Sequence, residues 1–168
     1  GEGAHDDGAG CAHVLEAMRL LATSGSRPRR TVRAVLFANE ENGLRGAKAY
    51  DAAHGAEVHV AAIETDSGGA TPRAFSCTKK GAEAEALRPL FLPLEEFGCG
   101  GFLPGGGGGA DLGPLAARGV PCFGLVTEGH RYFDFHHSAL DVVANVHPRE
   151  LSLGAAALAY AASALADR

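Results

Sequence analysis

The amino-acid sequence predicts an α/β fold whose functional site lies along one edge of the sheet. Short apolar runs alternate with segments in which apolar residues recur at helical spacing, and acidic residues follow the apolar runs directly. Of the 168 residues, 46% are hydrophobic, which is sufficient for one domain with a sizeable core. No internal repeat or domain linker is visible in the sequence.

The first half of the chain is expected to contain two helices and two largely buried strands. In chain order they are a helix at residues 11–23, a strand at 32–38, a helix at 43–54 and a strand at 58–63. Each strand runs directly into acidic residues, which are Glu40, Glu41, Glu64 and Asp66. In an open α/β sheet, polar residues at strand ends indicate where a ligand binds.

The second half of the chain is less regular because Pro and Gly interrupt it. Pro89 and Pro93 fall within the helical segment 82–97, so a kink or two short helices are expected there. The stretch 98–109 contains eight glycines and is expected to be a loop near the site, or else a flexible surface connection. The other expected elements are a short strand at 74–78, a short helix at 111–118, a strand at 120–126 and a last helix that Pro148 opens.

The composition argues against several classes of protein. The net charge of -5 and the lack of a long basic run argue against nucleic acid as the main partner. No apolar stretch is long enough to span a bilayer, so no membrane partner is expected. The cysteines lack the Cys-x-x-Cys spacing of a zinc site and are expected to be buried thiols, with a disulfide left open. They are Cys11, Cys77, Cys99 and Cys122.

The adjacent carboxylates Glu40 and Glu41 are costly at the end of an apolar strand. Each loses hydration when ionised, and each raises the pKa of the other unless a cation compensates. Successive side chains of an extended chain point to opposite sides, so the two acids are expected to have different roles. One can bind a metal while the other faces a water molecule or a substrate. The alternative is a solvated acidic turn.

Two further pairs of adjacent residues carry candidate chemistry. Asp6 and Asp7 lie in a glycine-rich loop, where their negative charge disfavours phosphate and favours a cation. A helix N-terminus is the alternative, since its dipole accommodates a carboxylate. His136 and His137 lie in an aromatic-rich segment, and we expect one of them to be functional and the other structural.

With these acids and a late histidine, the chain resembles the di-zinc exopeptidase family that includes bacterial leucyl aminopeptidases and plasma glutamate carboxypeptidase. The resemblance covers nearly all 168 residues. Its motifs are Gly3-Ala4-His5-Asp6-Asp7-Gly8, Asn39-Glu40-Glu41, Glu64-Thr65-Asp66 and His137-Ser138-Ala139-Leu140-Asp141. The fold expected from it is a three-layer sandwich with a largely parallel or mixed central sheet.

The resemblance also implies a role for individual residues. It makes Glu40 the general base, and it makes His137 rather than His136 the metal-binding histidine. The metal ligands that it implies are Asp6, which bridges two zinc ions, together with Glu41, Asp66 and His137. Asp111 and Tyr132 lie in segments that resemble the family's substrate cleft, in Gly109-Ala110-Asp111 and Tyr132-Phe133-Asp134.

The chain departs from the family at its beginning. The family has a further metal-binding histidine in a His-x-Asp motif, at a position that precedes Gly1 in this chain. We therefore expect residues 1–168 to form a single catalytic domain that is incomplete at the N-terminus, with the leading strands missing. Such a chain should bind at most one zinc firmly and hydrolyse peptides poorly. Two tightly bound zinc ions would mean that another residue, such as His5 or His13, takes the missing position.

By resemblance, the intact protein hydrolyses a peptide bond near the end of a peptide or dipeptide substrate. The resemblance suggests a secreted or periplasmic protein, and it leaves a homodimer open. Whether the amino or the carboxyl end of the substrate is recognised also stays open. One alternative is acyl transfer with one zinc, as in glutaminyl cyclases, and the other is a non-catalytic binding domain with a peptidase-like fold.

Overall fold

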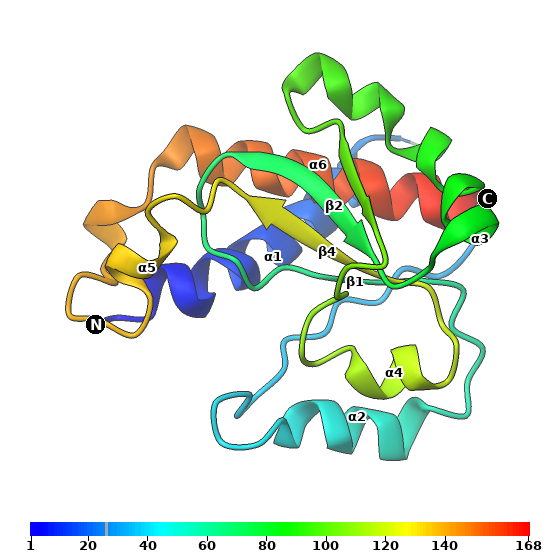
Figure 1. Cartoon of the computed structure of the whole chain (residues 1–168), viewed down its shortest axis with the longest axis horizontal. Helices are drawn as coiled ribbons and strands as arrows, with labels where there is room; N and C mark the ends of the chain where they lie inside the picture. Colours follow the sequence, from blue (N-terminus) through cyan, green and yellow to red (C-terminus); the bar gives the residue numbers. More distant parts are fainter. Residues whose placement is uncertain (26) are drawn as a thin grey trace.

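The computed structural model of the chain describes residues 1–25 and 27–168, which form a four-stranded mixed sheet with helices packed on both faces (Figure 1). The elements follow one another in the order η1 (Ala4–Gly8), α1 (Ala9–Thr23), α2 (Arg45–His54), β1 (Ala62–Glu64), β2 (Pro72–Cys77), α3 (Gly81–Glu85), η2 (Arg88–Leu90), η3 (Leu92–Phe97), β3 (Gly101–Pro104), α4 (Gly113–Ala117), β4 (Cys122–Thr127), α5 (Tyr132–Phe135), η4 (Val143–Asn145) and α6 (Pro148–Asp167).

The strand order in the sheet is β1-β4-β2-β3. β1 and β4 are parallel, β2 and β3 are parallel, and β2 runs antiparallel to β4. The carboxyl ends of β1 and β4 therefore point the same way, towards the end of the sheet at which β2 begins. The loops that follow these two strands can meet at this end.

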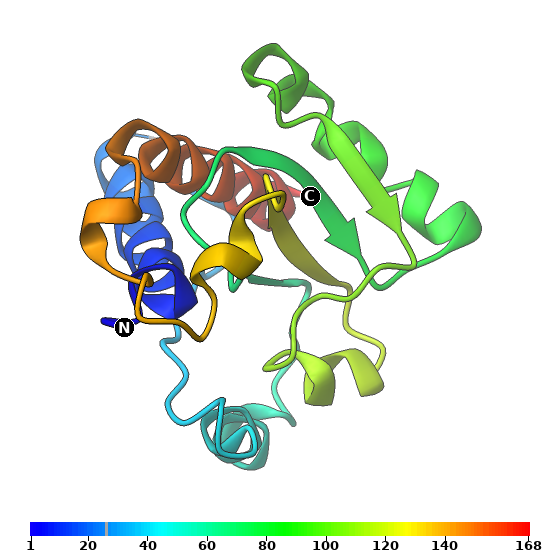
Figure 2. The same cartoon turned by 60° about the vertical axis from the view of Figure 1, so that its left-hand side comes forward.

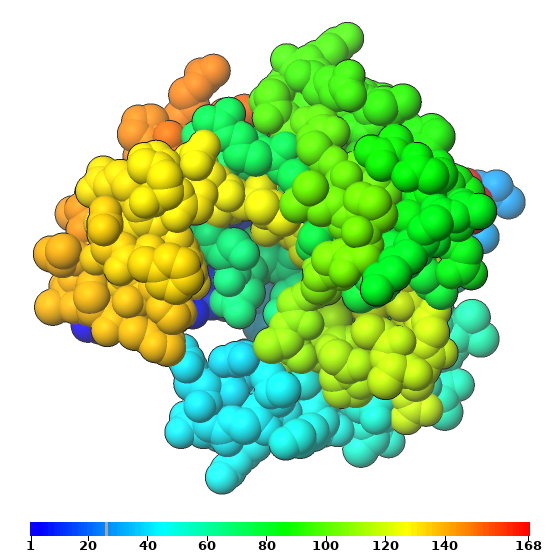
Figure 3. All heavy atoms as spheres, in the orientation of Figure 1, coloured from blue at the N-terminus to red at the C-terminus, as the bar shows by residue number. Residues whose placement is uncertain are grey.

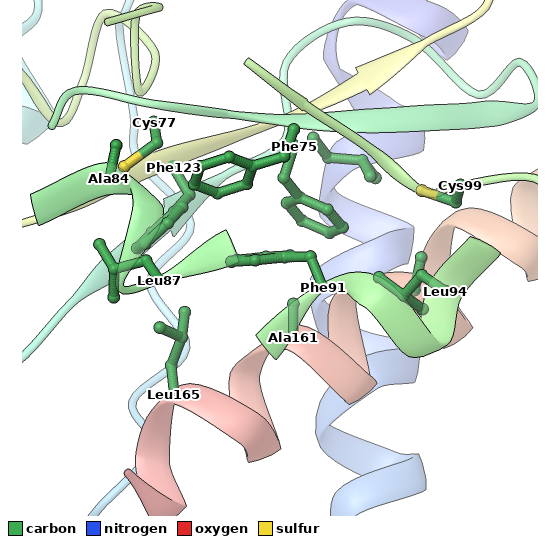
Figure 4. Close-up of a cluster of buried hydrophobic side chains, with 13 residues drawn as sticks. Phe75, Cys77, Ala84, Leu87, Phe91, Leu94, Cys99, Phe123, Ala161 and Leu165 are labelled. Carbon is green, nitrogen blue, oxygen red and sulfur yellow. The ribbon is translucent and has the colours of Figure 1, made fainter. Parts of the chain in front are cut away.

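Helices α1 and α6 pack against each other and cover one face of the sheet (Figures 1 and 2). The core on this face is rich in phenylalanine, and Figure 4 shows Phe91 of η2–η3 between the sheet and Ala161 of α6. The ring centroid of Phe91 lies 5.1 Å from that of Phe75 and 5.3 Å from that of Phe123. Tilted aromatic pairs at this separation add to the stabilisation from burial.

The opposite face of the sheet is covered by α4 and α2. Leu112, Leu115 and Cys122 form a buried cluster there, against which Phe37 and Tyr50 pack. Cys122 and Phe123 are neighbours on β4 but belong to clusters on opposite faces, as the alternation of side chains along a strand requires. The expected three-layer arrangement with a mixed sheet is thus confirmed.

Most of the expected elements are present within one or two residues of their predicted bounds. The helices α1, α2, α4 and α6 and the strands β2 and β4 are confirmed. Pro89 and Pro93 break the segment 82–97 into α3, η2 and η3, as expected because proline has a fixed φ and no backbone N–H group.

The two predicted strands at 32–38 and 58–63 are largely wrong. Residues 31–39 have no regular secondary structure and pair with no described strand, and only Ala62–Glu64 of the second run joins the sheet. Leu36 is 50% exposed and Val58 93% exposed, so neither run is buried as expected. The apolar pattern was present, but a strand also needs a hydrogen-bonded neighbour, and β1 is an edge strand in the described sheet.

The glycine-rich stretch 98–109 differs from the expected loop because Gly101–Pro104 form β3, paired with β2. Gly105–Gly109, which we call the glycine strap, then crosses the sheet from β3 towards β1. A Cβ at Gly106 would lie 2.9 Å from Cβ of Ser76 on β2, and one at Gly108 would lie 2.5 Å from Cβ of Cys122 on β4. A Cβ at Gly109 would overlap the carboxylate of Glu64 on β1. Only glycine allows this close approach.

All four cysteines, each of which lies in the described part of the chain, are free thiols. Cys77, Cys99 and Cys122 are buried as expected, whereas Cys11 is only half-buried. Burial raises the pKa of Cys99 and of Cys122 to about 11, so these thiols stay protonated and unreactive. Among residues 1–25 and 27–168, every helix is too short or too polar to cross a membrane.

Candidate metal centre

The edge at which β1 and β4 end is hollowed between three segments of the chain. Figure 3 shows this hollow between the segment around residue 40 in cyan, the segment 128–141 in yellow and orange, and the segment 105–112 in yellow-green. Residues that are far apart in the sequence meet there, since β1 delivers Asp66 and β4 delivers α5 and the histidine pair.

Three of the residues with predicted metal-binding roles lie in direct contact. Nε2 of His137 lies 2.8 Å from Oε1 of Glu41 and 3.0 Å from Oδ2 of Asp6. The contact with Glu41, followed by the charges of Glu41 and Asp6, raises the pKa of His137 above its usual value. An imidazole nitrogen between two carboxylates is the donor set of a zinc site, with the three side chains contributed by separate segments.

His136 is a further nitrogen donor at the same place, which the sequence alone had set aside. Its Nε2 lies 3.4 Å from Oδ2 of Asp6, and its ring stacks on that of His137 with a centroid separation of 3.8 Å. One donor atom each of Asp6, His136 and His137 lie within 4.8 Å of one another. The sequence shows that the two histidines are adjacent, but it does not show that both imidazole rings face Asp6.

Asp7 and Asp66 complete an acidic group that lacks a compensating cation among the described side chains near it. Burial, and then the charge of Asp66, raise the pKa of Asp7 to about 8. Burial, followed by the charges of Asp6 and Glu40, raises the pKa of Asp66 to about 6. Crowded carboxylates raise the pKa values of one another, and a bound cation would lower them. The residues present therefore fit a divalent metal.

Glu40 and Glu41 are separated by the turn in which they lie. Asn39 has a positive φ of 65°, and the N–H groups of Gly43 and Leu44 both donate to the carbonyl oxygen of Glu40. Glu41 contacts His137. The charge of Glu40 raises the pKa values of Asp66 and Asp111, and the charge of Glu41 adds a smaller contribution at Asp66. The two acids thus have different partners, although the cause is the turn and not the alternation of a strand.

Asp111 and Tyr132 belong to two different segments that border the hollow. The carboxylate of Glu64 accepts hydrogen bonds from the backbone N–H groups of Asp111 at 3.3 Å and Leu112 at 2.9 Å, which fixes the end of the glycine strap. Burial and Glu40 raise the pKa of Asp111. Burial and Asp6 raise the pKa of Tyr132, whose ring lies 4.9 Å from that of His136. The hydroxyl of Tyr132 therefore stays protonated and can donate a hydrogen bond.

His5 and His13, the two candidates for an additional ligand, are engaged elsewhere. Nδ1 of His5 accepts a hydrogen bond from the N–H of Gly69 at 3.2 Å, and its Nε2 lies 3.2 Å from the carbonyl oxygen of Asn145. His13 is fully buried, with Nδ1 2.9 Å from Oγ1 of Thr65. Neither ring belongs to the cluster of metal-donor atoms in the described residues.

The mixed sheet, the helices on both faces and the oxygen and nitrogen donors at the ends of β1 and β4 define an α/β domain with a candidate metal centre. Residues 1–162 match the profile of Peptidase family M28, and the chain belongs to this family. It is 32% identical to carboxypeptidase Q of Mus musculus over 169 residues and 33% identical to carboxypeptidase Q of Homo sapiens over 172 residues. The fold matches the crystal structure of a peptidase M28 precursor from Shewanella amazonensis with a TM-score of 0.91 and 32% identity.

These similarities cover almost all of this chain but only part of each relative. The alignments include 99% of this chain and 36% of either carboxypeptidase Q, and the structural match covers 38% of the Shewanella protein. The chain thus spans a little over a third of the length of these relatives.

Proposed function

We propose that the protein is a zinc-dependent exopeptidase that hydrolyses a peptide bond near the end of a peptide or dipeptide. The observation that carries the proposal is the contact of His137 with both Glu41 and Asp6, at 2.8 Å and 3.0 Å. Three protein ligands leave a zinc coordination position open for water or substrate, as catalysis requires. Membership of Peptidase family M28 supports peptide hydrolysis as the reaction.

Asp6, Glu41 and His137 would hold one zinc ion, and Asp66 with the shared Asp6 would contribute to a second. Bound zinc supplies Lewis acidity that polarises a carbonyl group and lowers the pKa of water. The acidic surroundings support this proposal, because burial and neighbouring carboxylates raise the pKa values of Asp7 and Asp66 and a cation would compensate their charge.

Glu40 is the general base of this proposal. It is close enough to Asp66 and Asp111 to raise their pKa values, yet it makes no contact with His137 that would tie it to the metal ligands of the described site. Its carboxylate would take a proton from the attacking water and return it to the leaving amine. Tyr132 would donate a hydrogen bond to the substrate, and the carboxylate of Asp111 would bind a polar or cationic substrate group.

The experiment compares Glu40→Gln with Glu41→Gln, with Glu96→Gln as the matched control. Glu96 belongs to another pair of adjacent glutamates and is exposed, so its substitution should change neither property. Glu40→Gln should keep the zinc content and lower turnover by ~10²–10⁴, the usual contribution of a general base. Glu41→Gln should weaken zinc retention. Equal zinc loss and equal residual activity in both variants would refute the division of roles.

The zinc stoichiometry of the 168-residue chain is a second test. The proposal assigns one complete set of three ligands, Asp6, Glu41 and His137, so we expect one firmly bound zinc and weak or absent peptide hydrolysis. Zinc content after dialysis measures the first, and dipeptidase and aminopeptidase assays measure the second. Two tightly bound zinc ions with full activity would show that His136 or another residue completes the second site.

A further inference from the structure

Asp141 is a buried carboxylate that binds the backbone of the loop carrying Asp6. Only 3% of Asp141 is exposed. Its Oδ1 accepts a hydrogen bond from the N–H of His5 at 2.5 Å, and its Oδ2 accepts one from the N–H of Asp6 at 3.2 Å. Its own carbonyl oxygen accepts a further bond from the N–H of Glu2 at 2.6 Å. A carboxylate with two backbone donors makes charge-assisted hydrogen bonds that are stronger than neutral ones.

The side chain of His5 extends this arrangement to the other loops of the site. Because Nδ1 accepts from the N–H of Gly69, Nε2 carries the proton of the neutral ring and donates to the carbonyl oxygen of Asn145. The ring stacks on Phe135 at a centroid distance of 4.9 Å and an interplanar angle of 6°. His5 is 95% buried, and a Cβ at Gly68 would lie only 2.9 Å from its Nδ1.

Together these contacts connect the segments that carry three of the proposed metal ligands. Asp6 follows His5 directly, and its own N–H is held by Asp141. Gly69, held by the ring of His5, lies three residues after Asp66. Phe135 lies two residues before His137, and Asp141 lies four residues after it. The side chains of His5 and Asp141 make these bonds with backbone groups and none with a ligand side chain.

We propose that His5 and Asp141 form a positioning clamp that holds Asp6, Asp66 and His137 at the spacing that zinc requires. The inference rests on the proposed function and adds two residues that do not touch the metal themselves. Without the clamp, the backbone of Asp6 and the turn after Asp66 would be free to shift, and the ligands would have to be ordered by the metal. Partners that orient metal ligands typically contribute 10–100-fold to metal affinity.

The test uses Asp141→Asn and His5→Phe in the 168-residue chain. The amide of Asn presents an NH₂ group to one of the two backbone donors, so one of the bonds is lost. Phe retains the stack on Phe135 and loses both ring hydrogen bonds. Zinc affinity, measured by competition with a chelator, should fall by ~10–100-fold in each variant. The visible absorption of bound Co²⁺ should also change, because it depends on the arrangement of the ligands.

The controls are Asp51→Asn and His54→Phe, which remove a half-buried carboxylate paired with Arg118 and a partly exposed imidazole paired with Glu57. Neither should change zinc affinity. If Asp141→Asn does not fold, His5→Phe, which preserves the stacked core, carries the test. Folded variants that bind zinc within twofold of the original, with the same Co²⁺ spectrum, would overturn the clamp and leave the proposed function intact. An original chain that binds no zinc would overturn both.

Discussion

The stability of the domain should depend on pH through His13, a histidine that is enclosed between α1, α6 and the turn after β1. Its exposed fraction is 0%, its Nδ1 lies 2.9 Å from Oγ1 of Thr65, and its Nε2 faces Gly154. Burial lowers the pKa of His13 from 6.5 to about 4. In the unfolded chain the imidazole is hydrated and titrates near its ordinary value.

Whether acid stabilises or destabilises the domain follows from the number of protons that His13 binds in the folded and in the unfolded chain. Between pH 6.5 and about 4 the unfolded chain carries a proton on His13 and the folded chain does not, so acid favours unfolding. The stabilisation is complete above pH 6.5 and is lost as the pH falls towards 4. At about 1.4 kcal/mol per pH unit, this loss amounts to about 3 kcal/mol.

The assay is urea unfolding of the original chain and of His13→Asn between about pH 7 and about pH 4. Asn retains a polar group for Thr65 but does not titrate, so the difference in free energy of unfolding isolates the imidazole. The carboxyls with raised pKa values, such as that of Asp7, are common to both chains and cancel. His54→Asn, at an exposed histidine, is the control. A difference between original and variant that stays constant within about 0.5 kcal/mol over this range would show that His13 is not buried in its neutral form.

Two further predictions concern glycines at close contacts. Gly154→Ala should destabilise the chain by about 1–3 kcal/mol in thermal or urea unfolding, because its Cβ would overlap Nε2 of His13 and lie 2.7 Å from Cε1. A gain in stability, as alanine normally brings to a helix, would contradict this packing. Gly108→Ala should cost a similar amount, since its Cβ would lie 2.5 Å from that of Cys122, whereas Gly107→Ala has free space and should change stability by less than about 0.5 kcal/mol. Equal effects at 107 and 108 would mean that the glycine strap does not lie on the sheet.

Local sequence signals were sufficient for those elements whose stability depends on their own residues. The apolar stripe of α6 and its opening Pro148 predicted a helix that the structure contains from Pro148 to Asp167. The run 120–126 predicted β4 because it is buried on both faces of the sheet, with Cys122 and Phe123 in opposite cores. In these cases the pattern and the tertiary environment agree.

Elements that depend on distant partners could not be predicted in this way. The run 32–38 has the residues of a strand, but in the structure it lines a cavity of about 570 Å³ together with α1, α6 and β1, and no described strand pairs with it. β3 contains Gly101 and Pro104, which are poor strand residues, and it forms because β2 offers a free edge. Pairing partners are long-range information that a local pattern does not contain.

In the candidate site, too, some features follow from local sequence motifs and others depend on distant partners. The motifs predicted that Asp6, Glu41 and His137 lie together, and in the structure His137 contacts the other two, while their role as metal ligands stays a prediction. The position of His136 beside Asp6 depends on the backbone of the segment around it, in which His137 has a positive φ of 55°. The hydrogen bonds of His5 and Asp141 join residues 136 positions apart, a relation that becomes visible only in three dimensions.

The glycine strap can hardly be shorter than it is, because it has to reach from β3 to β1. From β3 to β1 there are three strand-to-strand steps, which at about 4.8 Å each amount to about 14 Å. Five residues from Gly105 to Gly109 reach at most about 17 Å when fully extended. The strap therefore has almost no slack, and removal of one glycine would shorten it to the span itself. A deletion would break the hydrogen bonds from the backbone N–H groups of Asp111 and Leu112 to the carboxylate of Glu64, or would separate β3 from β2. An added residue, by contrast, could bulge outwards into solvent.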